Sequence, residues 1–284
     1  MKKLLIMFSL FGAMFANAES LRVEISEIAS NPESFTIVDV RDEQIYLEGH
    51  IKGAVNFPAS LTFDDLTISG RITPPNQMQS LIQQKGLDIH DNIAIYDDGS
   101  FFDAARLFWS LEVYGFTNVK LLNGGYHEWQ SLDLPISTQA ITPEPSQYIA
   151  SIDNKKLATK FATQIASRSP SQVVIDARTT DAYQGIISTA QRFGHIPQAE
   201  HIPATHNIAS SNGMSKLKDL NELKSTYQNI DPNQKVIIYC AIGRVSSTNY
   251  FALRELGYDV ANYDASWREW GNDLNLPITN PSGQ

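Results

Sequence analysis

The chain has 284 residues, 42% of them hydrophobic, and a formal net charge of −9 at pH 7. This length is enough for two domains that each bury a hydrophobic core. The acidic balance argues against nucleic acid or an anionic membrane surface as a partner, so any anion-binding site must be built locally.

Residues 1–18 have the pattern of a secretory signal peptide. Two lysines precede an apolar run at 4–15, and Ala16-Asn17-Ala18 forms a cleavage site. The run is short for a membrane-spanning helix, so we expect removal of the segment rather than a membrane anchor. The mature protein would begin at Glu19, carry a net charge of −11 and be exported, either to the periplasm or out of the cell.

After this segment the chain contains the same short motifs twice, in the same order and 137 to 145 residues apart. The pairs are residues 36–41 and 173–178, 49–54 and 194–199, 92–96 and 235–239, 128–129 and 269–270, and 134–136 and 276–278. Such an internal repeat predicts two copies of one domain. We expect the first copy at 19–140, a proline-containing linker at 141–149 and the second copy at 150–284.

Within the first copy, short apolar runs alternate with helical patterns. Strands are predicted at 37–40, 93–96 and 119–122, and helices at 78–85 and 104–114. The alternation predicts an α/β fold, in which two tandem domains each contain a parallel sheet flanked by helices.

Both copies carry an aspartate at a strand end and a Gly-His pair shortly afterwards. Asp39 and Asp176 are each followed two positions later by an arginine, so we expect them to bind loop amides or that guanidinium rather than to act in catalysis. His50 and His195 occur in both copies, which favours a structural role. No residues have the spacing of metal ligands, so no metal site is predicted.

The two copies differ at one loop, which contains the only cysteine of the chain. An apolar strand at 236–239 leads into Cys240, and a helical pattern that Gly257 can end follows the loop. The first copy has Asp97 at the equivalent position. A lone cysteine often serves as a small hydrophobic residue. This one, however, is expected at the carboxyl edge of a parallel sheet, where α/β proteins bind their ligands.

The loop after Cys240 has features that activate a thiol. Gly243 allows a tight turn, and successive backbone N–H groups at a helix N-terminus bind anions and hold a cysteine as its thiolate. Arg244 adds a positive charge. The loop therefore predicts a nucleophilic sulfur that attacks an anionic substrate.

Six motifs carry a resemblance to a known family: residues 38–41, 49–54, 176–178, 194–197, the Cys240 loop and 263–271. In this order they make the sequence similar to the tandem-domain rhodaneses, the thiosulfate and 3-mercaptopyruvate sulfurtransferases. The resemblance implies an inactive first copy. It also implies that Cys240 carries sulfur as a persulfide from thiosulfate or 3-mercaptopyruvate to cyanide or a thiol, with no metal or organic cofactor. The rest of the loop would bind the substrate: Ala241, Ile242, Gly243, Arg244, Val245 and Ser246.

Several positions depart from the family pattern. Ala182 stands where larger members have a substrate-binding arginine. Ala241-Ile242 matches neither the basic loop of thiosulfate-type enzymes nor the Gly-Ser loop of mercaptopyruvate-type enzymes. Gln198 and Ala265 replace usual glycines.

These departures affect substrate choice more than the fold. We expect Arg244 to take over recognition of the anion, with Arg192, Arg106 and Trp267 as candidate helpers. Arg106 could equally serve in packing or in a salt bridge between the domains.

Three other functions compete with that of a sulfurtransferase. A rhodanese-like phosphatase needs an arginine six positions after the cysteine, and that position is Ser246. A thioredoxin-like reductase needs a second cysteine. A sulfur-relay or binding module that acts on a protein partner, with little turnover of small molecules, stays open as the alternative.

Overall fold

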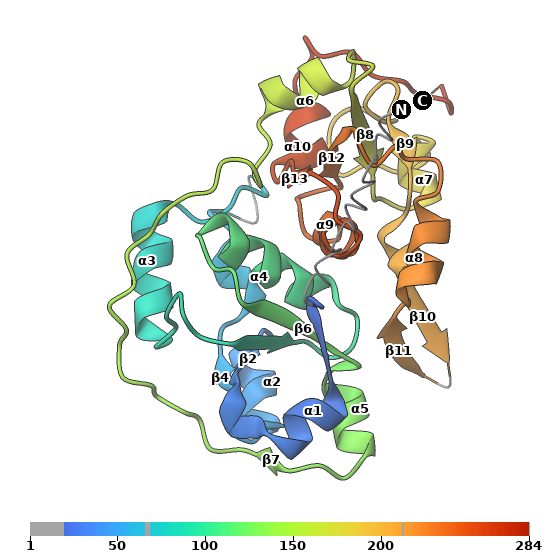
Figure 1. Ribbon diagram of the computed structural model, residues 1–284. Helices are drawn as coiled ribbons and strands as arrows, with labels where there is room; N and C mark the ends of the chain where they lie inside the picture. Colours follow the sequence, from blue (N-terminus) through green and yellow to red (C-terminus); the bar gives the residue numbers. More distant parts are fainter. Residues whose placement is uncertain (1–19, 66–68, 212, 284) are drawn as a thin grey trace, which may run out of the picture.

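The computed structural model describes residues 20–65, 69–211 and 213–283, and the chain forms two lobes (Figure 1). Each lobe contains a parallel sheet flanked by helices, so the predicted fold class is confirmed. The predicted signal peptide at 1–18 lies outside the described residues.

The sheet of the first lobe has the strand order β1-β6-β5-β2-β4, and all neighbours in it are parallel. Its strands are β1 (Arg22–Glu24), β2 (Thr36–Asp39), β4 (Val55–Asn56), β5 (Ile93–Tyr96) and β6 (Val119–Asn123). Its helices are α1 (Ile25–Ser30), α2 (Glu43–Glu48), α3 (Pro75–Gln84), α4 (Phe102–Val113) and α5 (Gly125–Ser131), with 3₁₀ turns η1 (Pro32–Ser34) and η2 (Ala59–Thr62). A short antiparallel pair joins β3 (His50–Ile51) to β7 (Ile136–Ser137).

The second lobe repeats this plan with the parallel order β13-β12-β8-β9. Its strands are β8 (Gln172–Asp176), β9 (Glu200–His201), β12 (Lys235–Tyr239) and β13 (Val260–Asn262). Its helices are α6 (Lys160–Ala166), α7 (Thr180–Tyr183), α8 (Leu220–Thr226), α9 (Ser246–Glu255) and α10 (Ser266–Trp270), with the 3₁₀ turn η3 (Ala204–Asn207). A hairpin of β10 (Ile208–Ser211) and β11 (Met214–Leu217) reaches the first lobe, where the Leu217 N–H donates to Asn123 Oδ1.

Burial explains why these segments form these elements. The four residues of β5 are all buried, as are the last four of β12, because both strands lie inside their sheets with helices on either side. In α4, every residue from Ala104 to Val113 is buried. An amphipathic surface helix would expose one face, so α4 must be covered on a second side.

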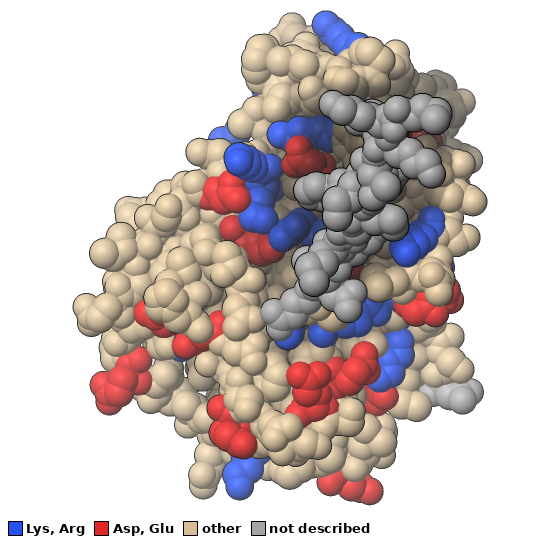
Figure 2. All heavy atoms as spheres, in the orientation of Figure 1, with Lys and Arg blue, Asp and Glu red and all other residues tan. Residues whose placement is uncertain are grey.

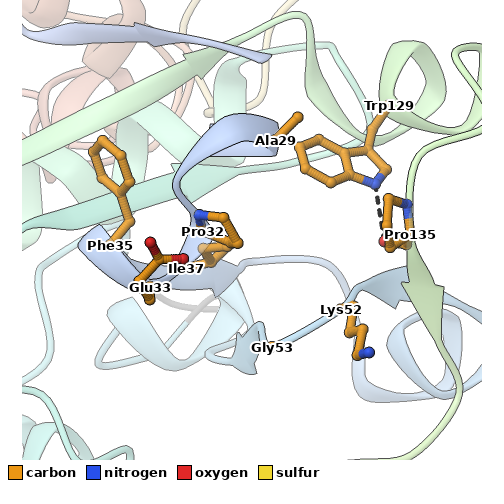
Figure 3. A pocket seen from close by; sticks show the side chains of 9 residues that line it. All are labelled: Ala29, Pro32, Glu33, Phe35, Ile37, Lys52, Gly53, Trp129 and Pro135. Atoms are coloured by element: carbon orange, nitrogen blue, oxygen red, sulfur yellow. Dashed lines mark hydrogen bonds between the residues drawn. The ribbon is translucent and has the colours of Figure 1, made fainter. Parts of the chain in front are cut away.

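That second side is provided by α9 of the other lobe. The Phe108 ring of α4 meets the Phe251 ring of α9 edge to face, with centroids 5.1 Å apart. One hydrophobic cluster contains residues of both lobes. Around it, Figure 2 shows Lys and Arg side chains next to Asp and Glu side chains over the region where the lobes meet. The lobes therefore share a core rather than merely touching.

The segment between the lobes runs along the outside of the first lobe (Figure 1). Tyr148 is buried, and its hydroxyl donates to the Tyr114 carbonyl at 2.6 Å. Gln83 accepts from the Ser146 N–H through its backbone and donates to the Tyr148 carbonyl through its side chain. The connection is thus fastened to α3 and α4.

Candidate active site

Cys240 is the first residue after β12, at the carboxyl edge of the second sheet. Its backbone N–H donates to Ser266 Oγ at 3.1 Å, and its carbonyl accepts from the Trp267 N–H at 3.0 Å. The side chain is 1% exposed and belongs to a small cluster with Ala177 and Ala204. Contacts to α10 fix the cysteine backbone, and burial shields the thiol from bulk water.

Ser246, the first residue of α9, brings a hydroxyl to the sulfur. Its Oγ lies 3.4 Å from Cys240 Sγ and 2.9 Å from Asn262 Oδ1. The Asn262 Nδ2 donates to the Gly243 carbonyl and to Ser247 Oγ, so Oδ1 is the acceptor that faces Ser246. A hydroxyl has one proton. Ser246 can therefore donate either to Asn262 or to a negatively charged sulfur.

The loop between Cys240 and α9 has unpaired backbone donors. Within the described part of the chain, the N–H groups of residues 241–246 donate no hydrogen bond. Gly243 has φ +71°, and a Cβ there would lie 2.6 Å from the Asp264 Cα, so a larger residue would strain the loop. Free amides at the start of a helix stabilise negative charge on a nearby sulfur.

In the equivalent loop of the first lobe, backbone N–H groups donate hydrogen bonds to the side chain of Asp97. The Asp97 carboxylate accepts from the N–H groups of Gly99 at 2.8 Å, Phe101 at 3.0 Å and Ala104 at 3.3 Å. Burial raises the pKa of Asp97 to about 6, and the charge of Asp98 adds to the rise. The same backbone feature is therefore occupied in the first lobe and free in the second.

Arg244 points to the first lobe. Its Nε and Nη2 donate to the two carboxylate oxygens of Asp103 at 2.5 and 2.6 Å. This pair lines a cavity of about 370 Å³ at the inactive loop, together with Asp97, Asp98 and His127. The Asp103 contact holds the pKa of Arg244 above its usual value, although burial opposes the rise. The predicted role of Arg244 in binding an anion stays a prediction.

Arg106 of α4 reaches under the Cys240 loop from the first lobe. Its guanidinium is fully buried and donates to the carbonyls of Gly243 at 3.2 Å, Gly70 at 3.1 Å and Thr62 at 3.1 Å. Burial lowers the pKa of Arg106 to about 10, so the group stays charged at neutral pH. Of the two roles weighed for Arg106, the contacts are those of a packing residue between the lobes.

A separate cavity of about 260 Å³ opens beside the Cys240 loop, entirely within the second lobe. Ala241 and Val245 of the loop line it, and Ala182 and Ile187 face them. Val245 also packs against the cluster that contains Cys240. Two loop residues, Ala241 and Val245, line this cavity, whereas only Arg244 of the loop lines the cavity at the inactive loop.

Comparison with known proteins places the chain in a family. The family model described as a rhodanese-like domain matches twice, at residues 23–132 and 158–273. The chain belongs to the rhodanese family. The fact that each match contains one of the two parallel sheets agrees with the repeat seen in the sequence.

The sequences of several relatives align with this rhodanese over most of its length. A protein of Haloferax volcanii, provisionally named a thiosulfate sulfurtransferase, is 32% identical over 281 residues, which are 93% of this chain and 96% of the relative. An SseA protein of Mycobacterium leprae with the same provisional name is 34% identical over 251 residues, covering 83% and 81%. The solved structure of SseA from Escherichia coli, described with the rhodanese fold and the mechanism of 3-mercaptopyruvate sulfotransferases, has a TM-score of 0.79 at 25% identity and covers 87% of this chain and 99% of its own.

Two other predicted helpers are bound into the rhodanese scaffold. The Arg192 guanidinium donates to the carbonyls of Trp270, Gly271, Asp273 and Leu276. Trp267 is fully buried, and its Nε1 donates to Ser188 Oγ and to the Arg192 carbonyl, while the Arg178 guanidinium lies 4.5 Å from its ring centroid. Both side chains hold the segment before β9 against α10, and neither lines the cavity at the loop.

The repeated polar motifs form the expected structural pairs. Arg41 binds Asp39 at 2.6 Å, and Arg178 binds Asp176 at 2.5 Å. In each copy a tyrosine hydroxyl from the neighbouring strand donates to the same aspartate. His50 and His195 each place Nδ1 near a tyrosine carbonyl and stack on that tyrosine ring.

Sequence reasoning missed the residues outside the Cys240 loop that hold this loop in place. The Asp264 carboxylate accepts the Ile72 N–H of the first lobe at 2.6 Å. A Cβ on Gly70 would overlap the backbone of Ile242. Asp264 belongs to a motif that the sequence does show, but its partner lies 192 residues earlier, and no sequence spacing signals that contact.

In the described ranges, no group of three or more His, Cys, Asp or Glu side chains is arranged to hold a metal ion. None of the helices in these ranges has the length and apolar character needed to cross a membrane.

Proposed function

We propose that this rhodanese is a sulfurtransferase that carries a sulfane sulfur on Cys240. The observation that carries the proposal is the placement of the only cysteine at the end of β12, beside unpaired backbone N–H groups and the Ser246 hydroxyl. The names of the relatives support this class, as do the sequence motifs.

In the first step the Cys240 thiolate attacks the outer sulfur of thiosulfate. The S–S bond of thiosulfate breaks, sulfite leaves with the bonding electrons, and Cys240 becomes a persulfide. The amides of residues 241–246 stabilise the negative charge on the outer sulfur and on the departing sulfite. With 3-mercaptopyruvate as donor, the leaving group would be pyruvate.

In the second step a nucleophile, cyanide or a thiol, attacks the outer sulfur and releases Cys240 as thiolate. This is covalent, ping-pong catalysis, which uses a cysteine persulfide and no metal or organic cofactor. The first lobe takes no part in the chemistry in this proposal, because Asp97 stands in place of the cysteine and occupies the equivalent amides.

Cys240→Ser tests the proposal. The wild-type protein, incubated with thiosulfate, should gain the mass of one sulfur atom and turn over thiosulfate with cyanide, whereas the variant should do neither. The fold should persist, because a serine is isosteric at this buried position, and a thermal melt checks that. Turnover by Cys240→Ser, or a wild-type protein that neither gains sulfur nor turns over thiosulfate or 3-mercaptopyruvate, would contradict the proposal.

A second candidate is a sulfur-relay module that passes the persulfide to a protein. Ala182 favours it, because this position lacks the arginine expected for a small anionic substrate. The relay predicts that the persulfide forms but is released slowly to cyanide and small thiols. Comparison of the loading rate with the release rate in single turnovers distinguishes the two functions.

We also propose that the protein is exported to the periplasm or beyond after cleavage behind residue 18. The support is the sequence pattern of residues 1–18. Mass spectrometry of the protein from fractionated cells tests this. A cytosolic protein that retains its first residues would contradict it.

A further inference from the structure

The cavity beside the Cys240 loop has an apolar lining, which is unexpected for an enzyme with an anionic donor. Four of its residues are aliphatic, namely Ala182, Ile187, Ala241 and Val245. Thr179, Ser188 and Thr189 complete it without charge. Ile187 is 53% exposed, so an apolar side chain also borders the entrance.

The one charged lining residue is Arg178, and its charge is already matched. The guanidinium is 5% exposed, binds Asp176 through two nitrogen atoms and donates to the Gly194 carbonyl at 2.8 Å. Arg244, Arg106 and Arg192 do not line the cavity, and each is held by a carboxylate or by carbonyl oxygens. No unmatched cation faces this cavity from the described residues.

A carboxylate or sulfonate in such a cavity would lose hydration without gaining a cationic partner. An alkyl group would instead be removed from water against aliphatic side chains, at a gain of about fourfold in binding per buried methylene. The volume of about 260 Å³ suits a compact group rather than a peptide. Thiosulfate is small enough to use the loop amides alone, so the cavity is available to the second substrate.

We propose that the cavity lined by Ala182, Ile187, Ala241 and Val245 selects as sulfur acceptor a small thiol with an uncharged, apolar group. This inference rests on the persulfide mechanism proposed above and adds the class of the acceptor. The acceptor sulfur R–S⁻ attacks the outer sulfur of Cys240–S–S⁻, the bond between the outer sulfur and Sγ breaks, and Sγ keeps its electron pair. The proton that the thiol released on forming R–S⁻ is taken up by the transferred sulfur, which gives R–S–SH and the Cys240 thiolate.

The test compares two thiols of similar size, 1-butanethiol and 3-mercaptopropionate. The full protein is loaded with thiosulfate, loading is confirmed by mass, and the rate of sulfur release is measured for each thiol. We expect 1-butanethiol to react roughly tenfold faster or more, since it buries two additional carbon groups in place of a carboxylate. Equal rates, or a preference for 3-mercaptopropionate, would overturn the inference.

The two thiols can also differ in intrinsic reactivity. Two variants control for this, because the ratio of the two rates is compared between proteins that meet the same pair of thiols. Ala182→Arg places a cation in the cavity and should lower the ratio of the two rates at least tenfold. Gln184→Arg adds the same charge on an exposed side chain near the same helix, outside the cavity, and should leave the ratio unchanged. A ratio that Ala182→Arg leaves unchanged, or that both variants lower equally, contradicts the assignment.

Failure of the proposed function gives a different result from failure of this inference. If thiosulfate does not load Cys240, the donor is wrong, and sodium polysulfide is used to form the persulfide. The two acceptors are then compared in the same way. A persulfide that forms and shows no preference for 1-butanethiol contradicts the acceptor class alone.

Discussion

At the scale of single residues, the two copies of the domain are a natural control for each other. Cys240 and Asp97 each come directly after the equivalent strand of their copy, β12 and β5 respectively. The carboxylate folds back on its own loop and binds three N–H groups, whereas the shorter thiol leaves the loop amides unpaired. Both copies therefore have the same loop backbone, but only in the second copy are its N–H groups free to stabilise a negatively charged sulfur.

Ser246→Ala should slow persulfide formation about 10- to 100-fold, because a hydrogen bond to a charged group contributes about 1.5–3 kcal/mol. Ser247→Ala is the matched control. Ser247 lies next in α9, is equally buried and also contacts Asn262, but it does not contact the sulfur. Rapid-mixing measurements of persulfide formation compare the two variants. Equal slowing by both would show that the effect is structural.

Asp97 gives a prediction of how the free energy of unfolding depends on pH. Its folded pKa of about 6 lies above the ordinary value of 3.8, so the folded protein binds a proton that the unfolded chain has already released. The free energy of unfolding should therefore fall as pH rises from about 4 to 6, by up to about 3 kcal/mol from this group. Asp97→Asn should remove this decline.

Urea titrations at several pH values measure the effect. Asp98→Asn should reduce the decline without abolishing it, since the charge of Asp98 is the second cause of the raised pKa. An unchanged pH dependence in Asp97→Asn would show that this carboxyl titrates normally.

At the scale of elements, the sequence predicted the framework well. The strand predicted at 93–96 is β5 with the same bounds, the prediction at 37–40 is shifted by one residue from β2, and the prediction at 119–122 ends one residue before β6. Short apolar runs between turn residues fix these strands locally. The short hairpin β10–β11 was not predicted, because half of its strand residues are exposed and its contacts reach into the other lobe.

The sequence indicates the geometry of the candidate site only where that geometry depends on local sequence. Cys240 and its loop could be proposed as the site because the strand, the glycine and the helix are adjacent in sequence. The orientation of Arg244 was not, because its partner Asp103 lies 141 residues away in the other copy. Arg106 was proposed as a helper from its position alone, and its four hydrogen bonds to Thr62, Gly70 and Gly243 depend on how the lobes dock.

The segment around Gly70 gives a test of this docking. Gly70→Ala would drive a methyl group into the Ile242 backbone and displace the Cys240 loop. We expect kcat/KM for thiosulfate to fall roughly tenfold or more, because small misplacements at a reacting centre are costly. Ser69→Ala, at the adjacent position, should change it little. If Gly70→Ala retains full activity, the first lobe does not position the loop.

At the scale of the whole molecule, the lobes are joined by a shared core and a buried polar network. Glu112 of α4 accepts from the Tyr250 hydroxyl at 2.6 Å and from the Arg254 guanidinium of α9 at 2.9 Å. Burial alone would raise the pKa of Glu112, but the contacts with Arg254, Lys156 and Tyr250 together outweigh it and lower the pKa. Since a charge buried between lobes requires its partners, we expect the two lobes to unfold together.

Glu112→Gln should break this coupling. The variant leaves Arg254 without its carboxylate; because the Arg254 side chain is 30% exposed, the cost should be about 1–3 kcal/mol, below that of a fully buried pair. The control is Arg71→Ala, which removes another ion pair between the lobes, that of Arg71 with Glu269. The Arg71 side chain is 60% exposed, so its loss should cost under about 1 kcal/mol.

Denaturant unfolding can be followed through tryptophans of each lobe, Trp109 and Trp129 in the first and Trp267 and Trp270 in the second. The wild-type protein and Arg71→Ala should show one transition by all four, and Glu112→Gln should unfold at lower denaturant, with the two sets of tryptophans separating. Coincident transitions at the wild-type midpoint in Glu112→Gln would show that the apolar contact of α4 with α9 suffices to hold the lobes together.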